Sequence, residues 1–150
     1  MGNIVLDAVS KVYPMTEEPG ASGVVAVDNV AMTIDDHQIV CFVGPSGCGK
    51  STVLNMIAGF ELPTSGRITV GDKVVQRAGP DRMVVFQSPA LFGWMTVHQN
   101  IVFGPRKRGM PKAQYEADAA RLITAVGLDE FATRYPYQLS GGMRQRVQIA

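Results

Sequence analysis

The most constraining feature of the sequence is a glycine-rich turn between a short apolar run and a helical pattern. The apolar run is Gln38–Val43 and the helical pattern is Lys50–Gly59. A short continuous apolar run is typical of a strand buried on both faces of a parallel sheet. The helical spacing places four apolar side chains on one face: Val53, Leu54, Ile57 and Ala58. Strand, turn and helix in this order predict an α/β fold.

The turn matches the phosphate-loop pattern G-x-x-x-x-G-K-[ST] in full. Its residues are Gly44, Pro45, Ser46, Gly47, Cys48, Gly49, Lys50, Ser51 and Thr52. The glycines let the backbone curl, so that successive N–H groups point at phosphate oxygens, and the helix start adds its positive dipole end. Lys50 supplies a full positive charge for the β- and γ-phosphates, and the Ser51 hydroxyl is a hard oxygen ligand that suits Mg²⁺. The turn therefore predicts a nucleoside triphosphate site.

A second candidate anion site follows Leu139. Ser140 offers a capping hydroxyl, Gly141 and Gly142 offer bare backbone N–H groups, and a helix is predicted over Gly141–Ala150. Taken alone, these residues fit an ordinary helix cap with flexible glycines equally well. Beside the phosphate loop, the anion site is the favoured interpretation.

The remaining pattern predicts strands first and helices later. Strands are expected over Asn3–Val12, Val24–Ile34 and Arg82–Gln87, a hairpin over Gly66–Val75, and a helix from Pro111 to about Val126. Residues 16–23 form a polar segment that predicts a turn. The change near Gln87 indicates two subdomains, about residues 1–87 with the phosphate loop and about 88–150 with the helices.

Composition excludes several other classes of protein. Hydrophobic residues make up 46% of the chain and charged residues 18%, which argues against disorder. The net charge of +1 includes no basic stripe, so no nucleic acid partner is expected. Cys41 and Cys48 form no CxxC pair, and no run approaches the roughly 20 apolar residues of a membrane span. The N-terminus has no signal-peptide pattern, so the protein is expected in the cytosol.

Three elements together resemble the ATPases of ABC transporters. The stretch Leu139–Gln145 resembles the LSGG-x-x-Q signature of that family, and Gln87 resembles its Q-loop glutamine. Tyr13 stands where the family places an aromatic residue that stacks on adenine, with a core aromatic as the alternative. The segments Phe86–Gly104 and Tyr135–Arg146 further resemble the ATP-binding subunits of importers for nitrate, sulfonate or taurine.

The resemblance implies a mechanism and a set of partners. Two ATPase chains pair head to tail, and each ATP lies between the phosphate loop of one chain and the signature of the other. The signature residues toward ATP are Ser140, Gly141, Gly142 and Gln145. By the same resemblance, Ser51 and Gln87 are expected to contribute to Mg²⁺ binding, and Lys50 and Gln87 are expected to take part in catalysis. The chain would be peripheral at the cytoplasmic face of the membrane, bound to a transmembrane permease that works with a substrate-binding protein.

The apolar stretch Pro89–Phe103 is expected to help form the groove that receives a helix of the permease. Internal packing is the alternative. We favour a mixture of the two, in which Trp94 or Phe92 is more exposed than the aliphatic side chains.

The family also needs an apolar strand ending in Asp-Glu after the signature helix, and a later switch histidine. Asp129 and Glu130 precede the signature and are interpreted as a helix end and loop. The expected architecture is therefore a partial ABC ATPase domain, incomplete at its C-terminus, with an antiparallel β subdomain and an α-helical subdomain, and its own hydrolysis is doubtful. The alternatives are a non-hydrolysing nucleotide-binding fragment, a soluble non-transport ABC protein acting on DNA or ribosomes, and a small-molecule kinase, which leaves LSGG unexplained.

Overall fold

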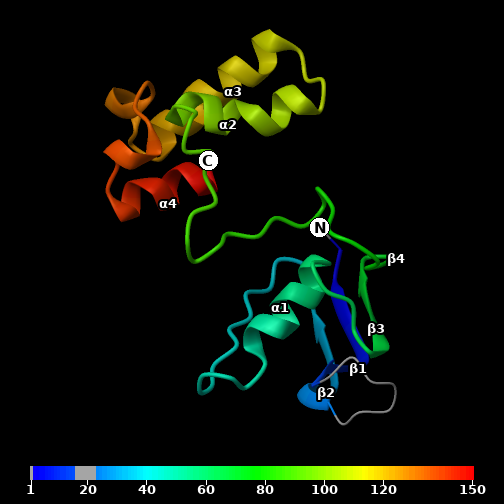
Figure 1. The fold of residues 1–150 in the computed structure, drawn as a ribbon. Helices are drawn as coiled ribbons and strands as arrows, with labels where there is room; N and C mark the ends of the chain where they lie inside the picture. Colours follow the sequence, from blue (N-terminus) through cyan, green and yellow to red (C-terminus); the bar gives the residue numbers. More distant parts are fainter. Residues whose placement is uncertain (1, 16–22) are drawn as a thin grey trace. The chain divides into compact units, whose positions relative to one another are not determined.

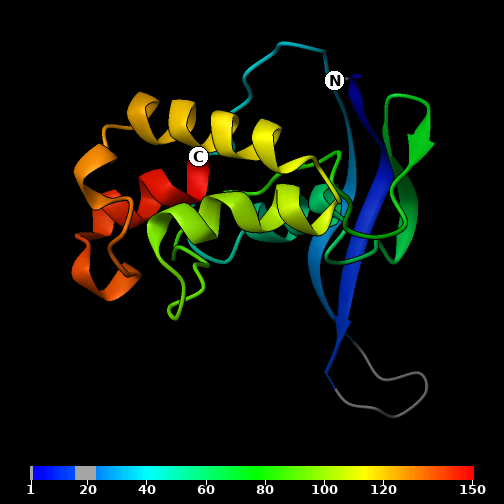
Figure 2. The same cartoon turned by 90° about the horizontal axis from the view of Figure 1, so that it is seen from above.

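The chain divides into two compact units in a computed structural model that describes residues 2–15 and 23–150. The first unit extends to Val84 and the second begins at Val85. The strands and the first helix lie in the first unit, and the other helices lie in the second (Figures 1 and 2). The turn predicted at residues 16–23 lies almost entirely outside the described residues.

The first unit contains a four-stranded antiparallel sheet with the strand order β2-β1-β3-β4. Its strands are β1 (Ile4–Pro14), β2 (Gly23–Ile34), β3 (Ser65–Val70) and β4 (Lys73–Val74) (Figure 1). The predicted hairpin is confirmed, since Val70 pairs with Lys73 across a two-residue turn in which Gly71 has a φ of 56°. The strands predicted near the N-terminus are confirmed as well.

An irregularity in β1 allows two side chains to share the core. Leu6 and Val9 are three positions apart, so a regular strand would point them to opposite faces. The register shifts between these residues, and Ala8 has a φ of 49°. A shift of this kind re-aims the side chains that follow it, and both Leu6 and Val9 are almost fully buried.

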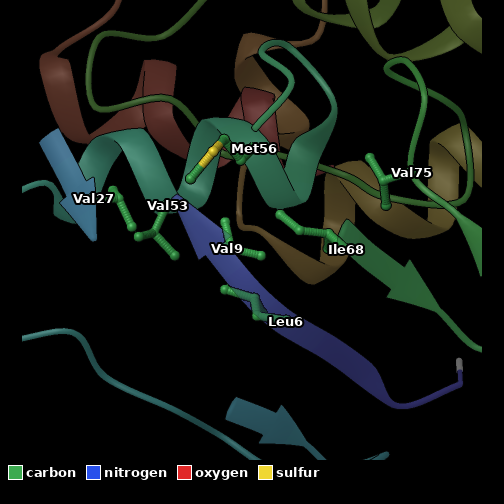
Figure 3. Close-up of a cluster of buried hydrophobic side chains, with 7 residues drawn as sticks. All are labelled: Leu6, Val9, Val27, Val53, Met56, Ile68 and Val75. Carbon is green, nitrogen blue, oxygen red and sulfur yellow. The ribbon is translucent and has the colours of Figure 1, made fainter. Parts of the chain in front are cut away.

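The helix α1 (Lys50–Ala58) packs on this sheet and completes the first core. Figure 3 shows Val53 and Met56 of α1 facing side chains of the strands. The helical face predicted from the sequence is partly wrong, because Leu54 is 53% exposed whereas Met56 is fully buried. Val53 and Met56 are three positions apart and share a face, but Leu54 is turned by about 100° from Val53. The core residues are Leu6, Val9, Val27, Val53, Met56, Ile68 and Val75.

Two predicted strands are absent from the described structure. Gln38–Val43 and Arg82–Gln87 form neither helix nor strand, and Ile39 and Val43 are about nine-tenths exposed. A parallel strand exists only where neighbouring strands supply its hydrogen bonds. Within residues 2–15 and 23–150 no strand pairs with either segment, so their apolar composition alone does not make them strands.

The second unit is built from helices around its own apolar cluster. Its elements are α2 (Val97–Lys107), α3 (Lys112–Ala125), the 3₁₀ turns Asp129–Phe131 and Pro136–Gln138, and α4 (Gly141–Ile149). The helix predicted from Pro111 is confirmed, although Pro111 caps it and does not occupy its first turn. No helix in the described part of the chain could cross a bilayer. The buried cluster is Val97, Ile123, Leu128, Leu139 and Val147.

The helix α2 was not predicted from the sequence, although the apolar stretch Pro89–Phe103 includes its first residues. Its start carries a capping box that could have revealed it. The Thr96 hydroxyl accepts from the Gln99 N–H at 3.2 Å, and the Gln99 side chain accepts from the Thr96 N–H at 2.9 Å. Thr-x-x-Gln before an apolar pattern is a known helix start. Pro105 inside the helix disguised the pattern.

Replacing Thr96 by alanine should lower the stability of the second unit by about 1 kcal/mol, the usual cost of losing an N-cap hydroxyl. Urea unfolding followed by the fluorescence of Trp94 measures this unit, because the chain contains no other tryptophan. Thr96→Ser keeps the hydroxyl and serves as the control. Equal stability of the alanine and serine variants would contradict the assigned cap.

Candidate nucleotide site

The phosphate loop owes its path to glycines in the left-handed region. Gly47 has a φ of 84° and Gly49 a φ of 88°, a conformation that costs other L-residues energy. Gly49 also caps α1 and approaches β2 closely. A Cβ built on Gly49 would lie 2.3 Å from the carbonyl oxygen of Ala26. Glycine at position 49 thus lets the loop pass directly against β2 into the helix.

The loop ends at the start of α1, where backbone N–H groups are free to meet an anion. The N–H of Val53 makes the first intrahelical bond, to the Gly49 carbonyl at 2.9 Å. Helix geometry leaves the N–H groups before it, from Lys50 to Thr52, without intrahelical partners. Residues 44–48 are exposed to solvent. The loop and helix start together have the geometry of an anion site.

Lys50 folds its side chain back over the loop. Its Nζ donates to the carbonyl oxygens of Gly44 at 2.9 Å and Pro45 at 2.6 Å, and it lies 3.4 Å from the Cys48 Sγ. The ammonium group therefore lies against the first two residues of the loop. Ser51, the next residue, is exposed in the first turn of α1.

Tyr13 lies beside this loop and is not a core residue. It is half-buried on β1, and its hydroxyl donates a hydrogen bond to the Glu61 carboxylate. The Thr52 side chain also lies within hydrogen-bonding reach of the phenol. Tyr13 is thereby tied to the last residue of the phosphate loop and to the segment that follows α1.

The titration of the Tyr13–Glu61 pair follows from these contacts. The hydrogen bond to Glu61 raises the pKa of Tyr13, burial raises it further, and the bond with Thr52 opposes the shift. The bond from Tyr13 lowers the pKa of Glu61 against the effect of burial, with help from Asn55 and the charge of Lys11. At neutral pH a neutral phenol therefore donates to an ionised carboxylate.

The predicted signature lies in the second unit, at the start of α4. The Ser140 hydroxyl accepts from the Met143 N–H at 3.3 Å, which confirms the predicted cap. Gly141 and Gly142 are exposed, and a Cβ added to either would meet no atom within 4 Å. Their backbone is therefore open to an approaching group.

Gln145 and Gln87 are placed differently from each other in this unit. The Gln145 amide donates to the carbonyl oxygen of Phe86 at 3.1 Å, so it bonds the segment just before Gln87. Gln87 itself is exposed. The helix α4 thus contacts the backbone of the residue that precedes Gln87.

The structure brings some of the predicted residues together and adds two that the sequence did not indicate. Tyr13 and residues 44–52 lie in the first unit, whereas Gln87 and Ser140–Gln145 lie in the second. Glu61 and Lys11 were missed, although both contact Tyr13. The spacing of Lys11 and Tyr13 by two positions on a strand was a usable signal. Glu61 is too distant in sequence for a local pattern to find.

Comparison with known proteins decides the family. The model of the family described as "ABC transporter" matches residues 27–150. The chain belongs to the ABC transporter family. The predicted resemblance to the ATPases of ABC transporters is thereby confirmed.

Known relatives and solved structures agree with this assignment. The chain is 42% identical over its whole length to the taurine import ATP-binding protein TauB of Chromobacterium violaceum, and covers 55% of it. Over 98% of its length it is 42% identical to the bicarbonate transport ATP-binding protein CmpD of Synechocystis, and covers 51% of it. This ABC chain therefore spans about half the length of these relatives.

The predicted ABC ATPase fold is confirmed by a solved dimer of the bacterial ABC transporter cassette MJ0796. The TM-score is 0.81 at 31% identity, and the alignment covers 97% of this chain and 67% of the other. A second structure of MJ0796, a dimer bound to ADP and Pi, aligns with a TM-score of 0.80 at 30% identity.

Proposed function

We propose that this chain binds ATP as part of the ATPase subunit of an ABC importer. The observation that carries the proposal is the loop of residues 44–49, in which Gly47 and Gly49 have left-handed φ values and the carbonyls of Gly44 and Pro45 accept from the Lys50 ammonium. An ammonium group, free N–H groups and a helix dipole converge there, and together they suit the terminal phosphates of ATP. The fit with Mg²⁺ rests on Ser51, an exposed hydroxyl beside the phosphate position.

Hydrolysis and transport are proposed for a protein of the relatives' full length. In that protein Lys50 would steady the γ-phosphate, and Gln87 would serve the Mg²⁺ or the attacking water. Ser140, Gly141, Gly142 and Gln145 would face the ATP of a second ATPase chain, paired head to tail. The open backbone at Gly141 and Gly142 supports this role. The dimeric assembly of the solved cassettes supports the pairing.

A permease partner is proposed on the surface that displays Trp94. This side chain is 74% exposed, whereas Val97 and Val102 nearby are buried. The Asn100 side chain bonds backbone groups of Phe92, Met95 and Thr96, and so holds the loop that carries Trp94. An exposed aromatic on a fixed loop is typical of a protein interface. The complete assembly would then lie at the cytoplasmic face of a membrane and draw solute from a substrate-binding protein.

The solute class is proposed from the names of the relatives and from the segments Phe86–Gly104 and Tyr135–Arg146, which resemble those of importers for nitrate, sulfonate or taurine. The relatives' names refer to taurine and to bicarbonate, both small molecules with an anionic group. A small anion such as nitrate, a sulfonate or taurine is therefore the proposed cargo of the importer.

Calorimetric titration of the chain with ATP, with Mg²⁺ and with EDTA, tests the proposal. Mg²⁺ should tighten ATP binding by the parent chain. In the presence of Mg²⁺, Ser51→Ala should bind ATP at least about 10-fold more weakly than the parent, which is the scale of mutations at metal sites. In EDTA the two chains should bind ATP alike, because the loop amides and Lys50 are unchanged.

Ser46→Ala is the matched control, since it removes a hydroxyl from the same loop but keeps the backbone N–H. It should retain the effect of Mg²⁺. Failure of the parent chain to bind ATP would contradict the proposed function. Loss of the Mg²⁺ effect in both serine variants would contradict the role of Ser51.

A further inference from the structure

A small charged cluster surrounds Tyr13, outside the phosphate loop. The Glu61 carboxylate accepts from the Tyr13 hydroxyl, and Lys11 Nζ lies 3.6 Å from the Glu61 Oε2. The same Nζ lies 5.2 Å from the centroid of the Tyr13 ring and donates to the Leu62 carbonyl at 2.8 Å. The phenol is therefore held at its hydroxyl by an anion and covered on one face by a cation.

Glu61 is itself fixed by the way α1 ends. Gly59 ends the helix in the left-handed conformation, and the Glu61 N–H donates to the Asn55 carbonyl at 3.4 Å. The Asn55 side-chain amide also lies 3.4 Å from the Glu61 Oε1. Three residues later, Thr64 accepts from the Val12 N–H at 3.0 Å and so fastens the segment to β1. The carboxylate therefore has a fixed position relative to the strand that carries Tyr13.

The same contacts fix the Tyr13 ring relative to the phosphate loop. Glu61 follows α1, the helix whose first turn contributes Lys50 and Thr52 to the loop. Whereas the bond to Glu61 raises the pKa of the Tyr13 phenol, Thr52, near the other end of the helix, acts to lower it. Because Lys11 covers one face of the ring, a flat partner would have to stack on the opposite face. The bond to Glu61, at the C-terminal end of α1, thus constrains where that face points.

We infer that Glu61 is a positioning residue for the nucleotide base, holding the Tyr13 ring in the orientation in which it stacks on adenine. The inference rests on the proposed ATP site and extends it to a residue outside its motifs. A ring that is already oriented loses little freedom when the base binds, whereas a free ring must be ordered at that moment. Lys11 assists by holding the carboxylate and by covering the other face.

The test compares ATP with inorganic tripolyphosphate, which has the phosphates but no base. Both are titrated into the parent chain and its variants by calorimetry. Glu61→Ala should weaken ATP binding by about 2- to 10-fold, the cost of ordering one side chain, and leave tripolyphosphate unchanged. Glu61→Gln should keep most of the parent's affinity for ATP, because its amide oxygen can still accept from the phenol.

Tyr13→Phe removes the same hydrogen bond from the other side and should weaken ATP to a similar extent. In the Tyr13→Phe background, Glu61→Ala should have no further effect, since the bond through which it acts is already gone. Equal, additive losses for ATP and tripolyphosphate would show a purely structural role and overturn the inference. If Glu61→Ala does not fold, the Tyr13→Phe and Glu61→Gln variants decide the question alone.

Tyr13→Ala separates this inference from the proposed function. Loss of the stack should weaken ATP by about 5- to 100-fold relative to tripolyphosphate. If Tyr13→Ala has this effect and Glu61→Ala has none, only the positioning role is wrong. If Tyr13→Ala leaves ATP unaffected, the adenine contact proposed for Tyr13 is wrong as well.

Discussion

Alanine at position 49 is expected to destabilise the first unit by about 2–5 kcal/mol and to abolish tight ATP binding. The left-handed φ of 88° costs a residue with a Cβ about 1–2 kcal/mol. The new Cβ would also lie 2.3 Å from the Ala26 carbonyl oxygen, so the loop or β2 must move, at a cost of about 1–3 kcal/mol more. The N–H groups of the displaced loop would then no longer converge on the phosphates of ATP.

Gly47→Ala is the matched control for this prediction. Gly47 has nearly the same φ, 84°, but no atom lies within 4 Å of an added Cβ. It should therefore cost only about 1–2 kcal/mol. Hydrogen exchange of the β1 and α1 amides measures the first unit specifically, because Trp94 reports on the second. Equal destabilisation by the two alanines would mean that the approach of Gly49 to β2 is not a real constraint.

Several features that depend on neighbours in sequence were predicted correctly, although the capping box of α2, which is equally local, was not recognised. The helix start at Lys50, the hairpin at Gly71 and the cap at Ser140 are each set by residues within a few positions of one another. The helix end at Gly59 belongs to the same group, since a left-handed glycine stops a helix locally. Local sequence was sufficient in all four cases.

Features that depend on distant partners were not predictable in the same way. Gln38–Val43 has the composition of a buried strand, but a strand forms only beside another strand. Leu54 was placed in the core because helical periodicity does not say which of two adjoining faces meets the sheet. The bond between Glu61 and Tyr13 joins residues 48 positions apart, so no spacing rule could indicate it.

Removal of the Lys50 side chain is expected to weaken nucleotide binding strongly without a change in the path of the loop. In the structure the ammonium donates to the Gly44 and Pro45 carbonyls, and a phosphate oxygen would be a stronger, charged acceptor. Hydrogen bonds to charged groups contribute about 1.5–3 kcal/mol, so Lys50→Ala should weaken ATP binding by about 10- to 150-fold. Lys50→Arg should recover part of the loss by keeping the charge, though its planar fork differs in shape from an ammonium group.

The dissociation constant of ATP for the Lys50→Ala chain, measured by calorimetry against the parent, is the most direct test of the account. Lys73→Ala controls for net charge, since it removes an exposed lysine from β4 in the same unit. We expect Lys50→Ala to bind ATP and tripolyphosphate at least 10-fold more weakly than the parent, on the scale of a lost charge-assisted bond, and Lys73→Ala to bind both as the parent does. An unchanged affinity of Lys50→Ala for ATP would contradict the proposal that this loop holds the terminal phosphates.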